Sequence, residues 1–147
     1  MANTTRGIRF FTEDSSVALK NKAKLRDWFI NTAKAEGNSI KELNYIFCSD
    51  AYLLEMNQSY LNHDTYTDII TFDNSETDRK VLGDIFISID RIKENAKNFG
   101  VTESEELHRV MIHGLLHLLG YGDKSKAEKT TMTEKENHYL ALRPFEV

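Results

Sequence analysis

Short apolar runs alternate along the chain with stretches whose apolar residues have helical spacing. Runs rich in β-branched and aromatic residues predict four strands, at residues 7–12, 43–48, 69–72 and 82–89. Helical spacing predicts helices from Ser15 or Ser16 to about Ala35, from Asp50, from Asp90 to Phe99, from Thr102 to Gly120, and from about Thr133 to Leu142. The short polar link between the last two strands favours an antiparallel pair. The pattern predicts an α+β fold, with a mixed sheet of about four strands and helices packed around one central helix, the one that starts at Thr102.

The segment 110–119 is apolar on nearly every side, which indicates a buried helix, yet it carries His113 and His117. Residues four apart project from one face of a helix, so the two imidazoles can bind one metal ion. Gly120 suits a left-handed helix end, and the turn after it can return Asp123 as an oxygen ligand. Three protein ligands leave a coordination position open, as catalytic zinc sites do. The alternative is that the histidines are hydrogen-bonded core residues and that Asp123 only caps a turn.

Length and composition describe one ordinary globular domain, residues 1–147. No apolar run approaches the ~18 residues that span a bilayer, so we expect no membrane segment. The N-terminus lacks the apolar core of a secretory signal. The single cysteine, Cys48, lies in an apolar strand, where a small core residue is expected. These features indicate the cytoplasm.

A net charge of −4 argues against general, unassisted nucleic-acid binding. An RNA substrate would therefore need a local basic surface or a partner. Lys124, Lys126 and Lys129 form one basic group, and it adjoins the proposed ligand Asp123. The polar stretch 124–130 that carries these lysines is expected to be a mobile loop.

Three other stretches of the chain carry motifs that occur together with the metal motif in one protein family. HGLLHLLGYGDK, residues 113–124, closely resembles the HGxLHLxGYDH pattern of the YbeY family, bacterial metal-dependent endoribonucleases linked to ribosomal RNA maturation. TDIITF at 67–72 resembles the family's TDVLSF strand, and LGDIFIS at 82–88 resembles its LGDI(V/F)IS strand. Met132 and Glu136 match a spaced Met and Glu after the metal motif. The resemblance runs in the same order from Met56 to Glu136, over half of the chain.

This resemblance implies a zincin-like fold and a zinc-dependent, single-strand-specific endoribonuclease that acts in ribosomal RNA processing and ribosome biogenesis. It implies one Zn²⁺ ion, although other divalent transition metals suit the same ligands. Its implied partners are ribosomal RNA and the small ribosomal subunit. Asp123 stands where the family has a third histidine, and a carboxylate can ligate zinc there. Leu61 stands where the family has an arginine that handles RNA, so another residue must supply that contact or it is absent.

Four further carboxylates are candidates for acid–base or supporting roles: Asp68, Asp84, Glu106 and Glu136. Glu106 falls on the same helix stripe as the two histidines, and Glu136 can orient a ligand histidine. We favour Asp84 with Glu136 as the supporting catalytic residues, because Asp84 sits in a family strand motif and charge within a sheet is costly unless paired. The alternative for the strand-borne carboxylates is a loop cap or an ion pair with lysine. His63, in a polar loop, is expected to be a surface residue and is also a candidate phosphate contact.

Position 114 separates this motif from the HExxH zinc proteases, which need a glutamate there as general base. Gly114 argues against peptide hydrolysis by that mechanism and suggests close approach of another backbone, or room for a large substrate. Two other functions remain open: a non-enzymatic, metal-stabilised ribosome-associated factor, and a metallohydrolase of another phosphoester or amide. An iron oxygenase would use the same ligand types, but nothing else in the sequence indicates a co-substrate site.

Overall fold

The computed structural model describes residues 5–61 and 68–146, with Tyr60 and Leu61 described by their backbone alone. Its strands form one sheet and are β1 (Ile8–Thr12), β2 (Ser39–Cys48), β3 (Ile69–Asp73) and β4 (Lys80–Ser88). Their order across the sheet is β1-β2-β4-β3. The first three in that order are parallel, while β3 runs antiparallel to β4 at the edge. The predicted four-stranded mixed sheet and its antiparallel pair are confirmed.

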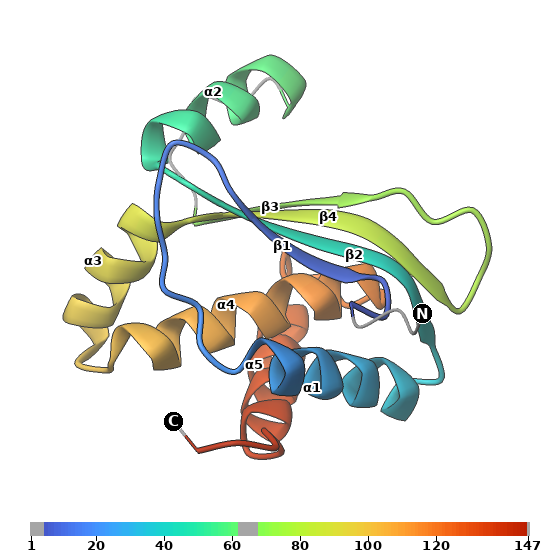
Figure 1. Cartoon of the computed structure of the whole chain (residues 1–147). Helices are drawn as coiled ribbons and strands as arrows, with labels where there is room; N and C mark the ends of the chain where they lie inside the picture. Colours follow the sequence, from blue (N-terminus) through green and yellow to red (C-terminus); the bar gives the residue numbers. More distant parts are fainter. Residues whose placement is uncertain (1–4, 62–67, 147) are drawn as a thin grey trace.

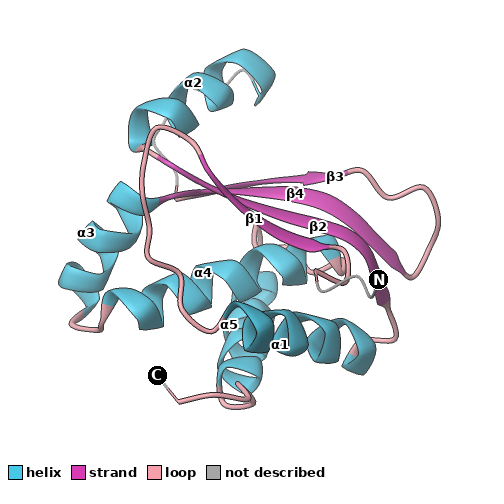
Figure 2. Ribbon diagram, in the orientation of Figure 1, coloured by secondary structure: helices cyan, strands magenta, loops and turns pink. Residues whose placement is uncertain are grey.

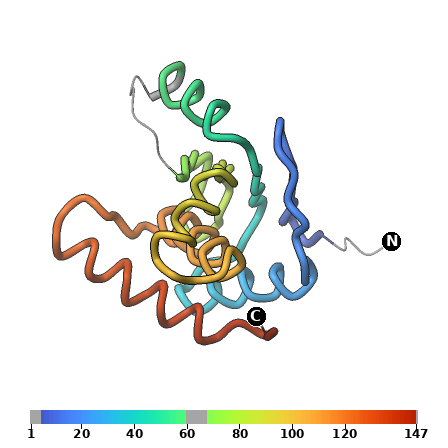
Figure 3. The backbone as a smooth tube through the Cα atoms, turned by 90° about the vertical axis from the view of Figure 1, so that its left-hand side faces the viewer, coloured from blue at the N-terminus to red at the C-terminus, as the bar shows by residue number. Residues whose placement is uncertain are grey.

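The described residues also form five helices: α1 (Lys22–Ala35), α2 (Asp50–Leu61), α3 (Ile89–Phe99), α4 (Glu103–Leu118) and α5 (Lys126–Leu140). Figures 1 and 2 show α1, α4 and α5 below the sheet, while α2 lies above one end of it. In Figure 3, α4 is seen nearly end-on, and the chain turns after it and runs obliquely past it as α5, drawn in red. Helix α4 packs against β3 and β4 and also contacts α1, α3 and α5, so it is the central helix that the sequence predicts. Within residues 5–61 and 68–146, every helix is too short or too polar to cross a bilayer.

The main core lies between the sheet and α4. Ile85 and Ile87 of β4 are fully buried on this side, as alternating residues of one strand face should be. Trp28 of α1 is also buried, and its indole N–H donates to the carbonyl of Tyr139 in α5 at 2.8 Å. Cys48 is fully buried, as predicted. The core therefore fixes α4 against the sheet from one side and against α1 and α5 from the other.

Local hydrogen bonds define both ends of α4. Thr102 caps its start by accepting a hydrogen bond from the backbone N–H of Glu105 at 3.1 Å. At the other end Gly120 has φ +108°, and its N–H donates to the carbonyl of His117. The N–H of Tyr121 then donates to the carbonyl of Leu116, which completes a Schellman motif. This tight ending turns the chain back over the last turn of α4.

Two predicted helix starts are wrong. Helix α1 begins at Lys22 rather than at Ser15 or Ser16, and its first turn follows Asn21 in a left-handed conformation. Helix α5 begins at Lys126, so the stretch 124–130 is mostly helical rather than a loop. The cause is a capping box between Ser125 and Glu128, followed by residues with high helix propensity.

The two helices that the sequence predicts to start at Asp90 and Asp50 are capped by side chains one or two residues earlier. Ser88, not Asp90, accepts the N-terminal hydrogen bond of α3. The hydroxyl of Ser49 accepts the Tyr52 N–H at the start of α2. Asp50 instead accepts hydrogen bonds from side chains outside α2, so its oxygens do not act as that cap.

Candidate metal centre

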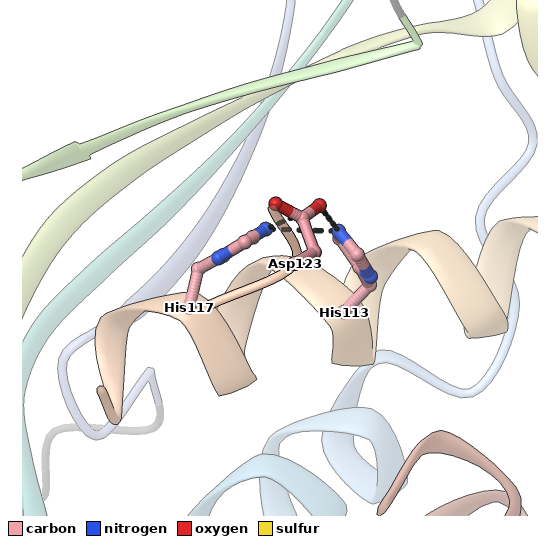
Figure 4. A group of neighbouring side chains, drawn as sticks. All are labelled: His113, His117 and Asp123. Atoms are coloured by element: carbon pink, nitrogen blue, oxygen red, sulfur yellow. Dashed lines mark hydrogen bonds and ion pairs between the residues drawn. The ribbon is translucent and has the colours of Figure 1, made fainter. Parts of the chain in front are cut away.

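Three side chains converge above the last turns of α4. Nε2 of His113 and Nε2 of His117 lie 2.9 Å apart. Oδ2 of Asp123 lies 3.2 Å from Nε2 of His117 and 3.4 Å from Nε2 of His113. Figure 4 shows the three groups pointing toward one another, with Asp123 delivered by the turn that follows the helix. The structure thus brings together all three predicted ligands, each of them half-buried.

The other nitrogen of each imidazole is already bound. Nδ1 of His113 lies 2.6 Å from Oε2 of Glu136, and Nδ1 of His117 lies 2.9 Å from the carbonyl oxygen of Tyr121. Carbonyl and ionised carboxylate oxygens only accept hydrogen bonds, so both Nδ1 atoms carry the hydrogen. With the hydrogen on Nδ1, the neutral form of each ring turns the lone pair of Nε2 toward the other ring and toward Asp123. Oxygen atoms that accept the other ring N–H commonly orient metal-binding histidines in this way.

Three electron-rich atoms so close together repel one another unless a proton or a metal ion lies among them, so this cluster could hold a metal ion. Zinc–ligand bonds of about 2.0–2.1 Å in a tetrahedral arrangement separate neighbouring ligand atoms by roughly 3.3 Å. The observed separations of 2.9, 3.2 and 3.4 Å bracket that value. His113, His117 and Asp123 therefore fit a single metal ion, and three protein ligands leave room for a water molecule or a substrate oxygen.

Acidic groups dominate the surroundings. Burial would lower the pKa of His113, but the hydrogen bond and charge of Glu136, helped by Asp123 and Asp68, raise it above its ordinary value. Burial raises the pKa of Asp68, with His113 opposing the shift. Burial also raises the pKa of Glu106, and the charge of Asp68 adds to it. Negative charge of this density favours a bound cation.

Arg109 contacts one of these acidic side chains, Glu136. Nη1 of Arg109 donates to Oε1 of Glu136 at 2.8 Å, while Oε2 of the same carboxylate holds His113. Arg109 precedes His113 by one helical turn, so the two side chains share a face of α4. Glu136 is buried, and its two oxygens link α5 to the metal helix.

Comparisons with known proteins bear on this site. A family model described as "Endoribonuclease YbeY" matches residues 8–142. The chain belongs to the YbeY family. A relative named "Endoribonuclease YbeY" from Cytophaga hutchinsonii is 58% identical over 138 residues, which cover 94% of this chain and 96% of the relative. A relative of the same name from Bacteroides thetaiotaomicron is 47% identical, covering 92% and 98% of the two chains.

A solved structure shares the fold of this chain. A solution structure of a protein from Thermotoga maritima superposes with a TM-score of 0.63 at 31% identity. The match covers 90% of this chain and 86% of that one. The sheet and the helices that carry the ligands therefore belong to an arrangement also seen in an experimentally determined structure.

The structure does not bring Asp84 to the metal centre of this YbeY-family chain. Its neighbours in β4, Gly83 and Ile85, face α4: a Cβ on Gly83 would lie 2.9 Å from Cδ1 of Leu118. Successive strand residues point to opposite faces, so Asp84 lies on the other side of the sheet. There it accepts a hydrogen bond from Nδ2 of Asn44 at 3.0 Å.

Among the described residues, Asp68 acts electrostatically on His113, while Glu106 lies one step further out, where the charges of Asp68 and Glu136 affect it. From the sequence we favoured Asp84 over Asp68 as a supporting residue, and we did not predict a role for Arg109. The spacing of Arg109 from His113 was a usable signal, because residues four apart share a helix face. His63 lies outside the described residues, and for Leu61 only the backbone is described.

Close packing against the sheet explains the glycine at position 114. A Cβ at this position would lie 2.9 Å from Cδ1 of Ile69 and 2.9 Å from Cγ2 of Ile85. The close approach that the sequence suggested is therefore made by side chains of β3 and β4 rather than by another backbone. The absence of a side chain on Gly114 lets the metal helix lie close beneath the sheet.

Proposed function

We propose that this protein is a zinc-dependent, single-strand-specific endoribonuclease that acts in ribosomal RNA processing and ribosome biogenesis. The observation that carries the proposal is the convergence of two Nε2 atoms and one carboxylate oxygen, with both Nδ1 atoms held by acceptors. The names of the relatives supply the substrate class. Placement among zincin-like folds belongs to the same proposal and rests on an HxxxH helix packed under a mixed sheet with an antiparallel edge strand.

His113, His117 and Asp123 would hold the metal. The set of two imidazoles and one carboxylate suits zinc, and other divalent transition metals can use it as well. When bound, the ion supplies the Lewis acidity that activates water near neutral pH and polarises a phosphoryl oxygen. Glu136 keeps His113 in the tautomer that presents Nε2, and the carbonyl of Tyr121 does the same for His117.

Asp68 is a better acid–base candidate for the proposed reaction than Asp84. Burial raises the pKa of its carboxyl group, and His113 and Asp123 are close enough for their charges to affect it. A carboxyl group with a raised pKa exchanges a proton more readily near neutral pH. Glu136 has a different role, because its two oxygens are already bound to Arg109 and His113.

The basic group of Lys124, Lys126 and Lys129 supplies a candidate surface for the RNA backbone. All three side chains are exposed, on the turn after Asp123 and the first turns of α5. Phosphate contacts of this kind weaken as salt concentration rises. Acidic groups surround the metal ligands themselves, so a partner such as the small ribosomal subunit would help to deliver the substrate. Ribosomal RNA as substrate also places the protein in the cytoplasm.

The proposal predicts that metal binding and cleavage disappear together. His117→Ala should lose both metal retention and cleavage of a labelled single-stranded RNA, while a duplex of the same sequence should resist the unmutated protein. Far-UV circular dichroism of the variant provides the folding control. Cleavage by a metal-free sample would refute the mechanism, and equal cleavage of strand and duplex would refute the proposed specificity.

A non-enzymatic, metal-stabilised ribosome-associated factor is the second candidate. The net charge of −4 and the leucine at position 61 favour it, because both weaken direct RNA handling. It predicts an occupied metal site, tight ribosome binding and no cleavage. A metallohydrolase of another phosphoester or amide would instead show metal-dependent activity without salt-sensitive RNA binding.

A further inference from the structure

A second polar cluster lies beside the turn that delivers Asp123. Its centre is Glu36, at the C-terminal end of α1, whose side chain is only 12% exposed. The phenol of Tyr121 donates to Oε1 of Glu36 at 2.6 Å, and the phenol of Tyr139 donates to Oε2. Nζ of Lys135 also donates to Oε2, at 3.2 Å. One carboxylate thus joins α1, α5 and the turn between the two metal-ligand segments.

The three hydrogen-bond donors stabilise the charged form of the Glu36 carboxylate. Burial would raise the pKa of Glu36, but the hydrogen bonds from Tyr121, Tyr139 and Lys135 lower it below its ordinary value. A half-buried carboxylate with three donors keeps its charge and holds each donor in a defined direction. The ammonium group of Lys135 also lies 5.4 Å from the ring centroid of Tyr121, so it holds that ring from a second side.

Tyr121 connects this cluster to the metal ligands through its backbone. Its carbonyl oxygen accepts the Nδ1–H of His117 at 2.9 Å, and its N–H donates to Leu116. Asp123 follows two residues later. The residue between them is Gly122, where a Cβ would meet the exposed carboxylate of Glu128. The orientation of Tyr121 therefore affects both the His117 ring and the starting point of Asp123.

We propose that Glu36 is a positioning residue that holds two of the three metal ligands in place by anchoring the side chain of Tyr121. This inference rests on the proposed metal centre and adds a residue far from it in sequence. The competing explanation is that Glu36 only ties α1 to α5 through Tyr139 and Lys135. The two explanations differ in which tyrosine matters for metal binding.

A matched pair of variants separates them. Tyr121→Phe and Tyr139→Phe each remove one phenol hydrogen bond from the same carboxylate, but only Tyr121 belongs to the ligand turn. Losing the hydrogen bond to a ligand histidine costs about 10–100-fold in metal affinity; Tyr121→Phe loosens that carbonyl contact without removing it, so we expect it to weaken Zn²⁺ binding by about threefold to tenfold, and Tyr139→Phe to change it by less than about twofold. The Zn²⁺ dissociation constant is measured by competition with a chromophoric chelator, and urea denaturation of the metal-free proteins reports their stability.

Two further measurements sharpen the result. The visible absorption bands of the Co²⁺-substituted protein report ligand geometry, and they should shift in Tyr121→Phe but not in Tyr139→Phe. Glu36→Gln keeps an oxygen acceptor for Tyr121, so it should retain more Zn²⁺ affinity than Glu36→Ala. Equal effects of the two tyrosine variants on affinity and spectrum would overturn the positioning role while leaving the metal centre intact. If the unmutated protein bound no Zn²⁺, the proposed metal centre would fail, and this inference with it.

Discussion

Glu136 lies behind His113, and its replacement by glutamine tests how the chain prepares the metal site. The two oxygens of Glu136 accept hydrogen bonds from Nη1 of Arg109 at 2.8 Å and from Nδ1 of His113 at 2.6 Å. Glutamine has the same shape but only one oxygen. One of the two donors would therefore face an amide N–H₂ group, or His113 would move its hydrogen to Nε2 and block metal binding.

The structure sets the size of the expected loss. A hydrogen-bond acceptor on the free nitrogen of a metal-bound histidine contributes about 10–100-fold in metal affinity, or about 1.4–2.8 kcal/mol. Glu136 is a buried, charged acceptor at short range, so we expect Glu136→Gln to fall in the upper half of that range at pH 8. The difference in Zn²⁺ affinity between the unmutated protein and Glu136→Gln should narrow as the pH falls. Glu136 raises the pKa of His113, so protons compete with the metal at a higher pH in the unmutated protein than in the variant.

The assay is a Zn²⁺ competition titration at several pH values, with Glu105→Gln as the control. Glu105 is also a carboxylate, on α4, but its Oε1 pairs with Nη2 of Arg143 at 2.9 Å rather than with a ligand histidine. Its substitution should leave Zn²⁺ affinity unchanged. An affinity for Glu136→Gln within about twofold of the unmutated protein at pH 8 would refute the reasoning.

Three further predictions follow from other parts of the fold. Burial, and next the charge of Arg143, lower the pKa of His108 to about 4, so the unfolded chain binds more protons than the folded one as the pH falls below 6.5. Urea denaturation should therefore show about 2 kcal/mol less stability from this residue at pH 5 than at pH 8, a loss that His108→Gln should not show; equal pH profiles would contradict this. Gly83→Ala should lower the free energy of unfolding by about 1–3 kcal/mol, because its Cβ would lie 2.6 Å from a backbone oxygen of β3; an unchanged urea midpoint would contradict the packing. Asp84→Asn should leave the Zn²⁺ dissociation constant unchanged, since Asp84 lies across the sheet from the ligands, and weaker binding would show that this placement is wrong.

The sequence predicts the sheet and the three ligands because both depend on short-range patterns. Apolar runs mark the strands, and the four-residue spacing of His113 and His117 fixes their common face. The start of α5 was also readable, since Ser125 and Glu128 have the spacing of a capping box. The start of α1 was not, because Ser15 and Ser16 are as good N-caps by composition as the left-handed Asn21 that precedes the helix.

The roles of the remaining carboxylates depend on contacts between distant segments. In β4 both faces of the strand are apolar, so its sequence does not show whether Asp84 or its neighbours turn toward α4. Glu36 meets Tyr121 across 85 positions of sequence, and no local pattern marks that pair. Tertiary packing alone shows which acidic side chains surround the ligands.

The most direct measurement is cleavage of a labelled single-stranded RNA by purified protein that has been chelated and then reloaded with Zn²⁺. His113→Ala, prepared in the same way, excludes a contaminating nuclease. The account predicts that Zn²⁺ restores cleavage in the unmutated protein and not in the variant. An unmutated protein that retains a full equivalent of Zn²⁺ and does not cut, or cleavage by both samples, would contradict it.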